Sequence, residues 1–258
     1  MQAFNTRPEN KRLIVTTSWD DGHPLDIRLA NLLAKFGASG TFYVPNRNSE
    51  GRPVMSPSQV QQVSRSFEIG GHSVDHVVLT QLPIDELHAQ IGGNKRWLES
   101  VIGKPITGFC YVRGQYNRNV KTAVQQLGYT YARTTENLRA EPTNDLFELP
   151  TTLQLYPHTK ATLMRNSVRG RTPWKKLRLL RTALGTKSLV TRVEKMINEC
   201  VDTGGYFHLW GHSWEIEEQN LWSELEHILR HLTALGSKIV HLTNHDACRA
   251  LQQEQMQK

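Results

Sequence analysis

Two adjacent carboxylates stand at the end of an apolar run near the start of the chain. Asp20 and Asp21 follow the segment LIVTTSW and precede Gly22 and His23. Neighbouring carboxylates repel each other, and their burial costs further free energy unless a positive charge compensates them. An Asp-Asp pair before glycine is otherwise typical of a solvated turn. The pair therefore raises the question of which cation or basic residue reaches this place.

Two histidine motifs further along the chain offer an answer. HSVDH places His72 and His76 four residues apart, so one helical turn would point both imidazoles the same way. HLWGHSWE contributes His212. One aspartate with two histidines can hold a divalent cation and leave positions open for water and substrate. We therefore expect Asp21 to bind a cation and Asp20 to accept a proton beside it.

Strand-like apolar runs alternate with helical patterns along the chain, which is typical of βα units and a parallel sheet. We expect strands at 13–19, 41–45, 67–73, 107–112, 129–135, 147–157, 205–214 and 238–243. The clearest helical patterns lie at 24–37, 57–65, 83–101, 119–128 and 221–236. In such folds the chemistry lies where strands end. We expect one catalytic domain over 1–258, with the motifs after its first, third and seventh strands.

The composition bounds the class of protein. A chain of 258 residues with 38% hydrophobic content suits a single α/β barrel. No apolar run approaches the roughly 20 residues that span a bilayer, and the first residues lack a signal-peptide pattern. The three cysteines are odd in number and far apart, which favours a reducing, cytoplasmic setting.

The positive charge is concentrated in one segment. The net charge is +7, yet no acidic residue occurs between Glu148 and Glu194, while residues 158–192 carry ten Lys and Arg. We expect this basic segment to be an insertion or helical part of the domain. Residues 172–185 have the pattern of a basic amphipathic helix, which can cover the barrel, lie on an anionic membrane or steer anionic substrates. No nucleic-acid reader motif is present.

The chain resembles the polysaccharide deacetylases, which form carbohydrate esterase family four and carry the NodB-homology domain. TSWDDGH stands at the T-F-D-D motif of that family, HSVDH matches H-[ST]-x-x-H, and HSWE matches three positions of H-P-W-E. The resemblance extends from about Leu13 to Thr243 in the expected order. It implies a distorted (β/α)7-type barrel and metal-assisted hydrolysis of an N-acyl group, usually acetyl, on an amino sugar.

The resemblance also implies roles for the motif residues. Asp20 would be the catalytic base and His212 the general acid, while Asp21, His72 and His76 would bind one divalent metal ion. Such a ligand set suits zinc first, and it also accepts cobalt, manganese or nickel. The metal and one backbone N–H would hold the oxyanion.

The third and fourth motifs of the family are altered. In FCYVRGQYN, Cys110 stands where the family often places an arginine that steadies the catalytic aspartate. The backbone N–H of Arg113 can still serve the oxyanion, and Arg113 or Arg133 is the candidate for the guanidinium. For the aspartate that tunes the acid histidine, the candidate is Glu148.

Several other residues have two interpretations. The aromatic residues near the motifs can form a substrate wall or pack in the core: Trp19, Tyr111, Trp210 and Trp214. His208 can point into the barrel beside the site or belong to the core. Cys110 is expected to be a buried, unreactive side chain. His241, His245 and Asp246 match no family motif, so we expect them to be structural or solvated.

These observations predict a metal-dependent N-deacetylase that acts on a saccharide or a saccharide precursor. The basic segment favours a lipid-linked or nucleotide-linked sugar and peripheral contact with the inner face of a membrane through residues 172–185. Two alternatives stay open. The altered third motif suits an amidase or deformylase acting on a non-polysaccharide amide, and the absent arginine suits a catalytically impaired sugar-binding barrel.

Overall fold

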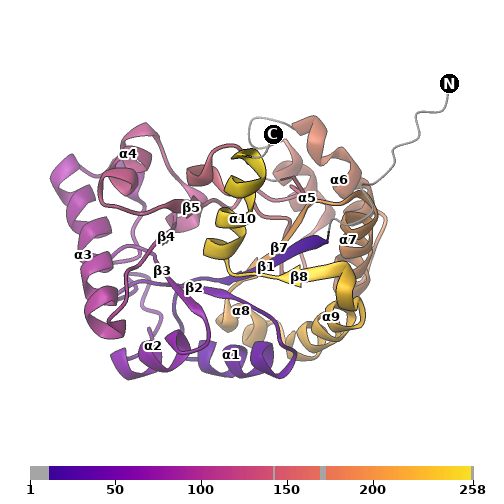
Figure 1. Cartoon of the computed structure of the whole chain (residues 1–258), viewed down its shortest axis with the longest axis horizontal. Helices are drawn as coiled ribbons and strands as arrows, with labels where there is room; N and C mark the ends of the chain where they lie inside the picture. Colours follow the sequence, from indigo (N-terminus) through magenta and orange to yellow (C-terminus); the bar gives the residue numbers. More distant parts are fainter. Residues whose placement is uncertain (1–11, 142, 169–172, 257–258) are drawn as a thin grey trace.

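One parallel sheet forms the centre of the structure, a computed structural model that describes residues 12–141, 143–168 and 173–256. Its strands follow the order β5-β4-β3-β2-β1-β7-β6, and β8 pairs separately with β1 (Figure 1). The strands are β1 (Leu13–Trp19), β2 (Thr41–Val44), β3 (Glu68–Gly71), β4 (Gly108–Cys110), β5 (Tyr131–Arg133), β6 (Leu153–Gln154), β7 (Tyr206–Gly211) and β8 (Ile239–His241).

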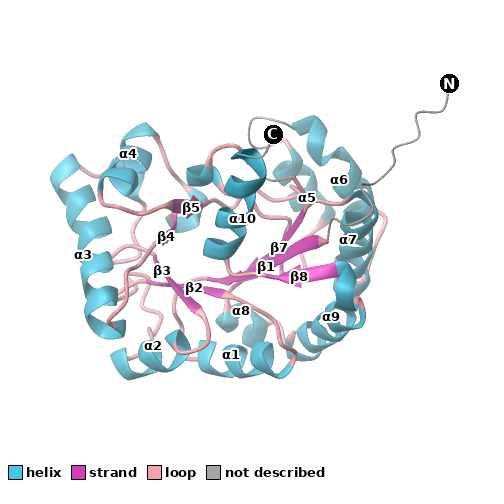
Figure 2. Cartoon of the chain, viewed as in Figure 1, coloured by secondary structure: helices cyan, strands magenta, loops and turns pink. Residues whose placement is uncertain are grey.

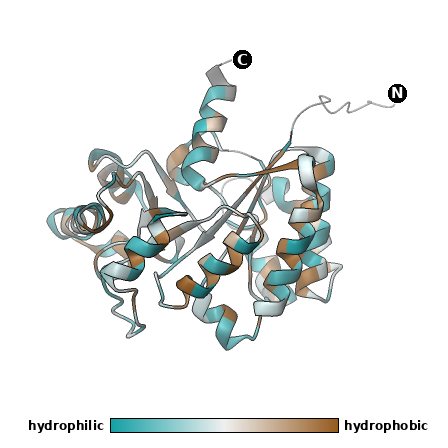
Figure 3. Cartoon of the chain, turned by 60° about the horizontal axis from the view of Figure 1, so that its bottom comes forward, coloured by the Kyte–Doolittle hydropathy of each residue, from teal (hydrophilic) through white to brown (hydrophobic). Residues whose placement is uncertain are grey.

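Helices form an outer layer around this sheet (Figure 2). They are α1 (Asp26–Lys35), α2 (Pro57–Ser64), α3 (Ile84–Ile102), α4 (Arg118–Gln126), α5 (Lys160–Ser167), α6 (Leu177–Leu184), α7 (Leu189–Thr203), α8 (Ser213–Glu218), α9 (Trp222–Ala234) and α10 (Asn244–Met256). Short 3-10 turns lie at η1 (Leu79–Gln81), η2 (Val112–Gly114), η3 (Leu146–Glu148), η4 (Pro173–Lys176) and η5 (Gly236–Lys238). Hydrophobic and hydrophilic residues alternate around the outer helices, as expected of helices that cover a sheet (Figure 3).

β1 is the strand around which the sheet is organised. All seven of its residues are buried, which is typical of a parallel strand with both faces covered. It pairs with β7 over residues 14–19, while its other edge is shared between β8 at residues 13–15 and β2 at residues 18–19. The residues that follow Trp19 therefore emerge at the centre of the carboxyl edge, between β7 and β2.

The curled sheet and its helices form a distorted (β/α)7-type barrel in one domain, as the sequence predicts. The largest departure from the expected strands lies at 147–157, where only Leu153–Gln154 is a strand. The preceding backbone instead crosses from β5 to β7: Leu149 N–H donates to Ala132 at 2.9 Å, and Thr152 N–H donates to His208 at 2.9 Å. Within the described residues, no helix combines the length and apolarity needed to cross a bilayer.

Local sequence signals explain the helix ends that flank the site. Ser56 caps α2 in a capping box with Gln59, and Pro57 occupies the first turn, where its lack of an N–H costs nothing. α3 ends at Gly103, whose φ of 68° is readily adopted only by glycine. β7 ends at Gly211, and the next residue, His212, is the N-cap of α8.

One buried amide ties α3 to the carboxyl ends of two strands. Asn94 is fully buried, and its Oδ1 accepts a hydrogen bond from the backbone N–H of His72 at 2.8 Å. Its Nδ2 donates to the carbonyl oxygen of Val44 and to Asn46 Oδ1, both at 2.9 Å. Because buried polar groups need partners, this side chain holds the start of the HSVDH loop in place.

We therefore expect Asn94→Ala to lower the free energy of unfolding by about 2–4 kcal/mol, since it leaves several buried polar groups without a partner. Urea denaturation in the presence of a chelator measures this loss apart from any effect of metal. Asn31→Ala on the exposed side of α1 is the control and should change stability by less than about 0.5 kcal/mol. Equal losses in the two variants would contradict this role for Asn94.

Candidate metal centre and active site

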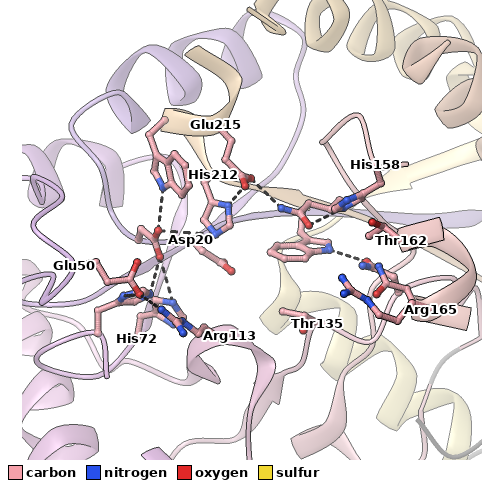
Figure 4. A pocket seen from close by; sticks show the side chains of 17 residues that line it. Asp20, Glu50, His72, Arg113, Thr135, His158, Thr162, Arg165, His212 and Glu215 are labelled. Carbon is pink, nitrogen blue, oxygen red and sulfur yellow. Dashed lines mark hydrogen bonds and ion pairs between the residues drawn. The ribbon is translucent and has the colours of Figure 1, made fainter. Parts of the chain in front are cut away.

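The carboxyl ends of three strands bring the sequence motifs to one cavity (Figure 4). Asp20 and Asp21 follow β1, His72 and His76 follow β3, and His212 follows β7. All five line a cavity of about 310 Å³. The structure thus brings together the five residues expected to bind metal or transfer protons.

Asp21, His72 and His76 form a compact, buried group. One ligand atom from each lies within 4.8 Å of the other two. Asp21 Oδ1 is 3.0 Å from His76 Nε2 and 3.6 Å from His72 Nε2. The two imidazole rings have centroids 5.1 Å apart. One carboxylate oxygen and two imidazole nitrogens thus face a common point.

The chemistry of these donors fits a divalent cation. Asp21 Oδ1 is buried and has no hydrogen bond of regular geometry with any residue that the structure describes. His72 Nδ1 donates to the carbonyl oxygen of Cys110 at 2.8 Å, which leaves the lone pair of Nε2 directed at Asp21. Burial would raise the pKa of Asp21, but the imidazoles of His72 and His76 hold it well below its usual value. The group therefore offers an ionised carboxylate and an oriented imidazole, as a metal site requires.

The backbone at this site is held in unusual conformations. Asp21, His76 and Arg113 have φ values of 75°, 53° and 55°, in the left-handed region that non-glycine residues rarely adopt. Each costs on the order of 1 kcal/mol or more and is tolerated where the surroundings impose it. Gly22, with φ of 58°, is also required for space, since a Cβ would lie 2.7 Å from Val44 Cγ1.

Asp20 has a different partner from Asp21. A buried ion pair joins Asp20 Oδ1 to Arg133, which lies on β5 and is fully buried. Arg133 also donates to the carbonyl oxygen of Thr134 at 3.2 Å, and its guanidinium lies 5.0 Å from the ring centroid of Trp210. Of the two arginines considered from the sequence, Arg133 is the one that contacts Asp20. Arg113 instead donates to Glu50 Oε1 at 2.7 Å on the cavity rim.

A chain of hydrogen bonds runs from His212 to the far wall of the cavity. His212 Nδ1 donates to Glu215 Oε2 at 2.6 Å, and Gln154 Nε2 donates to the same oxygen at 2.9 Å. His158 Nε2 donates in turn to Gln154 Oε1 at 3.0 Å. Burial alone would lower the pKa of His212, but the hydrogen bond to Glu215 and the charge of Asp21 raise it above its usual value. His212 Nε2 lies 3.9 Å from Asp21 Oδ2.

Glu215, not Glu148, is therefore the carboxylate that contacts His212, the residue expected to be the general acid. Glu148 lies outside the cavity lining and pairs with Lys121 at 2.9 Å. Glu215 belongs to the HSWE motif itself, three residues after His212, so the first turn of α8 brings the two side chains together.

Two of the four aromatic candidates are buried in the core instead of lining the cavity. Trp19 and Tyr111 are fully buried. Trp19 donates to Thr17, and Tyr111 donates to the carbonyl oxygen of Phe147. The substrate wall expected from these two residues is thus wrong, because both side chains point into the hydrophobic core.

The other two aromatic candidates do line the cavity. Trp210 Nε1 donates to Asn137 Oδ1 at 2.8 Å, and Trp214 Nε1 donates to Asp21 Oδ2 at 2.9 Å. Trp214 thereby fixes the second oxygen of the candidate metal ligand. Its ring is tilted by 30° against that of His212, with centroids 5.1 Å apart.

His208 and Cys110 belong to the buried framework. His208 is fully buried within hydrogen-bond distance of Thr16, Ser18 and Tyr206, and burial lowers its pKa well below the usual value. Cys110 Sγ lies 3.7 Å from Asp20 Oδ2 and forms a second possible ligand set with Asp20 and His72. Burial raises the pKa of the Cys110 thiol, which disfavours the thiolate that would bind a metal. Asp20 is already paired with Arg133. The set with Asp21 is therefore the better metal site.

The structure adds cavity residues that the sequence motifs do not include. They are polar side chains from loops, from β6 and from α5: Glu50, Thr135, Asn137, Gln154, His158, Thr162, Arg165 and Asn166. A second cavity of about 400 Å³ adjoins the first and shares four lining residues with it: Arg113, Thr135, Asn137 and Asn166. No sequence signal distinguishes these residues, because they reach the cavity only through the path of their loops.

Comparison with known proteins relates the chain to one family and one fold. Residues 7–132 match the family model described as polysaccharide deacetylase. No curated protein sequence matches the chain. A putative polysaccharide deacetylase from Mycobacterium smegmatis has 15% identity and a TM-score of 0.68, with 97% of this chain and 93% of that chain covered. A family 4 acetyl xylan esterase from Clostridium thermocellum, in complex with a cobalt ion, has 15% identity and a TM-score of 0.56, with 90% and 89% covered.

Two further matches mark the range of these relatives. The Streptococcus pyogenes deacetylase PplD has 21% identity and a TM-score of 0.49, and the match covers 52% of this chain and 62% of PplD. A CE4 family pseudoenzyme from Bacillus anthracis has 15% identity and a TM-score of 0.53, with 90% and 64% covered. At such identities the structures share the fold. The family model over residues 7–132 is therefore the comparison that relates this chain to the polysaccharide deacetylases.

Proposed function

We propose that the protein is a divalent-metal-dependent deacetylase that removes an N-acyl group, in particular N-acetyl, from an amino sugar. One observation carries this proposal. Asp20, paired with Arg133, and His212, paired with Glu215, both line the cavity that holds Asp21, His72 and His76. A proton acceptor, a proton donor and a set of metal ligands are the groups that hydrolysis of an amide requires.

Asp21, His72 and His76 would hold the metal. When bound, a divalent cation supplies a Lewis acid for the acyl carbonyl and for the attacking water. Trp214 and the Cys110 carbonyl orient two of the ligands, Asp21 and His72. Zinc is the first candidate, and cobalt, manganese and nickel suit the same donors.

Asp20 takes the proton of the attacking water in this scheme. Arg133 compensates its negative charge and fixes the orientation of its carboxylate from within the barrel. This pairing removes the main reason to regard the chain as an impaired sugar-binding barrel, since the arginine that is absent at position 110 is replaced from β5. An arginine on a neighbouring strand can thus serve the same carboxylate.

His212 gives a proton to the leaving amine. Glu215 accepts the hydrogen bond from Nδ1, so the proton to be transferred resides on Nε2, the nitrogen nearer to Asp21. The backbone N–H of Arg113 is the candidate donor to the oxyanion. Trp210 and Trp214 provide apolar walls for the sugar ring or the acyl group.

The adjoining second cavity supports a substrate larger than one sugar. The two cavities share part of their lining, including Arg113 and Asn166. A saccharide chain, or a second group of the substrate, can therefore extend from the acyl-binding site into the second cavity. A saccharide or a saccharide precursor fits this space, and we place the reaction in the cytoplasm. All three cysteines are free and buried, which is compatible with a reducing compartment. An N-formyl or non-saccharide amide is the alternative, because the substrate-facing loop after β4 departs from the family motif.

We expect Asp20→Asn to reduce kcat by about 10²- to 10⁴-fold while the metal content stays unchanged, because asparagine cannot accept the proton. Hydrolysis is measured on N-acetyl amino sugars, O-acetyl sugars, N-formyl sugars and small amides, which separates the substrate classes. Asp75→Asn is the matched control, since Asp75 lies within HSVDH but pairs with Arg47. Full activity of Asp20→Asn with intact metal would contradict the proposed base.

Replacement of a candidate ligand should abolish binding of the metal. We expect His76→Ala to lose stoichiometric metal and all measurable hydrolysis, because only two donors remain. Elemental analysis after dialysis measures the content, and titration with zinc or cobalt measures affinity. His227→Ala on the exposed side of α9 serves as the control. Unchanged metal content in His76→Ala would rule out the Asp21, His72 and His76 site.

Glu215→Gln tests the acid histidine. The variant should bind metal normally but lose about tenfold to a hundredfold in kcat, because the imidazole loses the carboxylate that orients it. KM should change little, since Glu215 acts through His212. Glu218→Gln on the same helix, where Glu218 pairs with Arg52 at 3.1 Å, is the control. A change confined to KM would instead indicate that Glu215 contacts the substrate.

A further inference from the structure

The exposed apolar side chains of the protein gather on one helical hairpin. Five large apolar side chains are exposed in the described chain, and four of them lie on α5, on its C-cap residue, on η4 and on α6. Met164 and Val168 are 52% and 71% exposed, and Trp174 and Leu177 are 69% and 47% exposed. The fifth, Ile84, lies at the start of α3. α5 and α6 pack side by side (Figure 1).

Helical spacing places these residues in two adjacent pairs. Met164 and Val168 are four residues apart at the end of α5, and Trp174 and Leu177 are three apart where η4 runs into α6. The inner sides of the same helices are buried through Leu163 and Leu179. We call the outward side, formed by Met164, Val168, Trp174 and Leu177, the hairpin surface.

Positive charge surrounds the hairpin surface. Five exposed cations have no ion pair with any residue in the described ranges: Lys160, Arg165, Lys175, Arg181 and Lys187. By contrast, Lys176 forms an ion pair with Glu136 at 3.0 Å, and Arg178 forms one with Glu199 at 3.1 Å. No acidic residue occurs between Glu148 and Glu194 in the sequence, so the acidic partners of this segment, Glu136 and Glu199, come from other parts of the chain.

The hairpin surface also adjoins the active-site cavity. Thr162, Arg165 and Asn166 of α5 line that cavity. Met164 on the same helix and Val168, which follows its last residue, are exposed. Figure 4 shows Thr162 and Arg165 at the side of the cavity away from His72. α5 is therefore both a wall of the cavity and an edge of the exposed apolar surface.

We propose that the hairpin surface docks on an anionic phospholipid bilayer. Exposed Trp and Leu next to Lys and Arg match the surface of a membrane, where the apolar side chains enter the interface and the cations contact the headgroups. A neutral protein partner would leave the excess of positive charge without a counterpart. Docking would place the cavity wall formed by α5 near the lipid headgroups. Delivery of a lipid-linked saccharide to the cavity would follow, and this extension, unlike the docking, rests on the proposed function.

Flotation with vesicles tests docking without any reference to hydrolysis. The full chain is mixed with vesicles of phosphatidylcholine alone or with about one third phosphatidylglycerol, at low and at high salt. We expect binding to the anionic vesicles that falls with salt, and at least about tenfold weaker binding to the neutral ones. Equal binding to both compositions, or none to either, would overturn the proposal.

Paired substitutions locate the contact. Trp174→Glu with Leu177→Glu should weaken binding to anionic vesicles at least about tenfold, whereas Ile84→Glu, an equally exposed apolar position on α3, should leave it unchanged. Lys160→Gln with Lys175→Gln should reduce the dependence on salt. Thermal melting confirms that each variant is folded, and the milder Trp174→Ser repeats the test. Equal losses in the Ile84 and Trp174 variants would contradict the assignment.

A second copy of the chain is the other partner that the hairpin surface could bind, so its presence must be tested. Light scattering after size exclusion gives the mass of the wild type and of the Trp174→Glu, Leu177→Glu variant. A monomeric wild type with lipid binding supports the proposal. If the wild type is a dimer, the variant is a monomer and neither binds lipid, the hairpin surface joins two copies of the chain. That result would overturn the proposal.

Discussion

Two neighbouring buried carboxylates at the end of β1 set the constraint on which the site depends. Asp20 and Asp21 cannot both remain charged at this depth without separate compensation. Arg133 compensates the first from inside the barrel, and the imidazoles of His72 and His76 face the second. Two consecutive carboxylates thus have separate partners, as the proposed roles of Asp20 as proton acceptor and Asp21 as metal ligand require.

The position of β1 makes that division possible. Because β2 and β7 flank its last residues, the loops after β2, β3 and β7 all open toward Asp20 and Asp21. The backbone at Asp21 is left-handed, with φ of 75°. The buried amide of Asn94 then fixes the start of the loop that carries both imidazoles. Strain and buried hydrogen bonds are thus concentrated where the geometry of the ligands must be held.

The cations of the basic segment are of two kinds, buried and exposed, and the composition of the segment does not distinguish them. Some of its cations are internal, since Lys176 pairs with Glu136 and Arg192 donates to the carbonyl oxygen of Thr186. Others, with Trp174 and Leu177, are exposed. Only the exposed group is available to an anionic surface, so the net charge of the segment overstates its capacity for binding. The same helix, α5, links that surface to the candidate active site.

The sequence by itself determined the order of the strands and the types of residue at three strand ends, since apolar periodicity and short motifs are local properties. It also restricted the arginine beside Asp20 to two positions. Only the tertiary structure decided between them, because Arg133 reaches Asp20 across the barrel from β5. Likewise, it placed Glu215 against His212, and it placed Trp19 and Tyr111 in the core. These outcomes depend on which side chains meet across the barrel, and distances between segments far apart in the chain are not encoded in any local pattern.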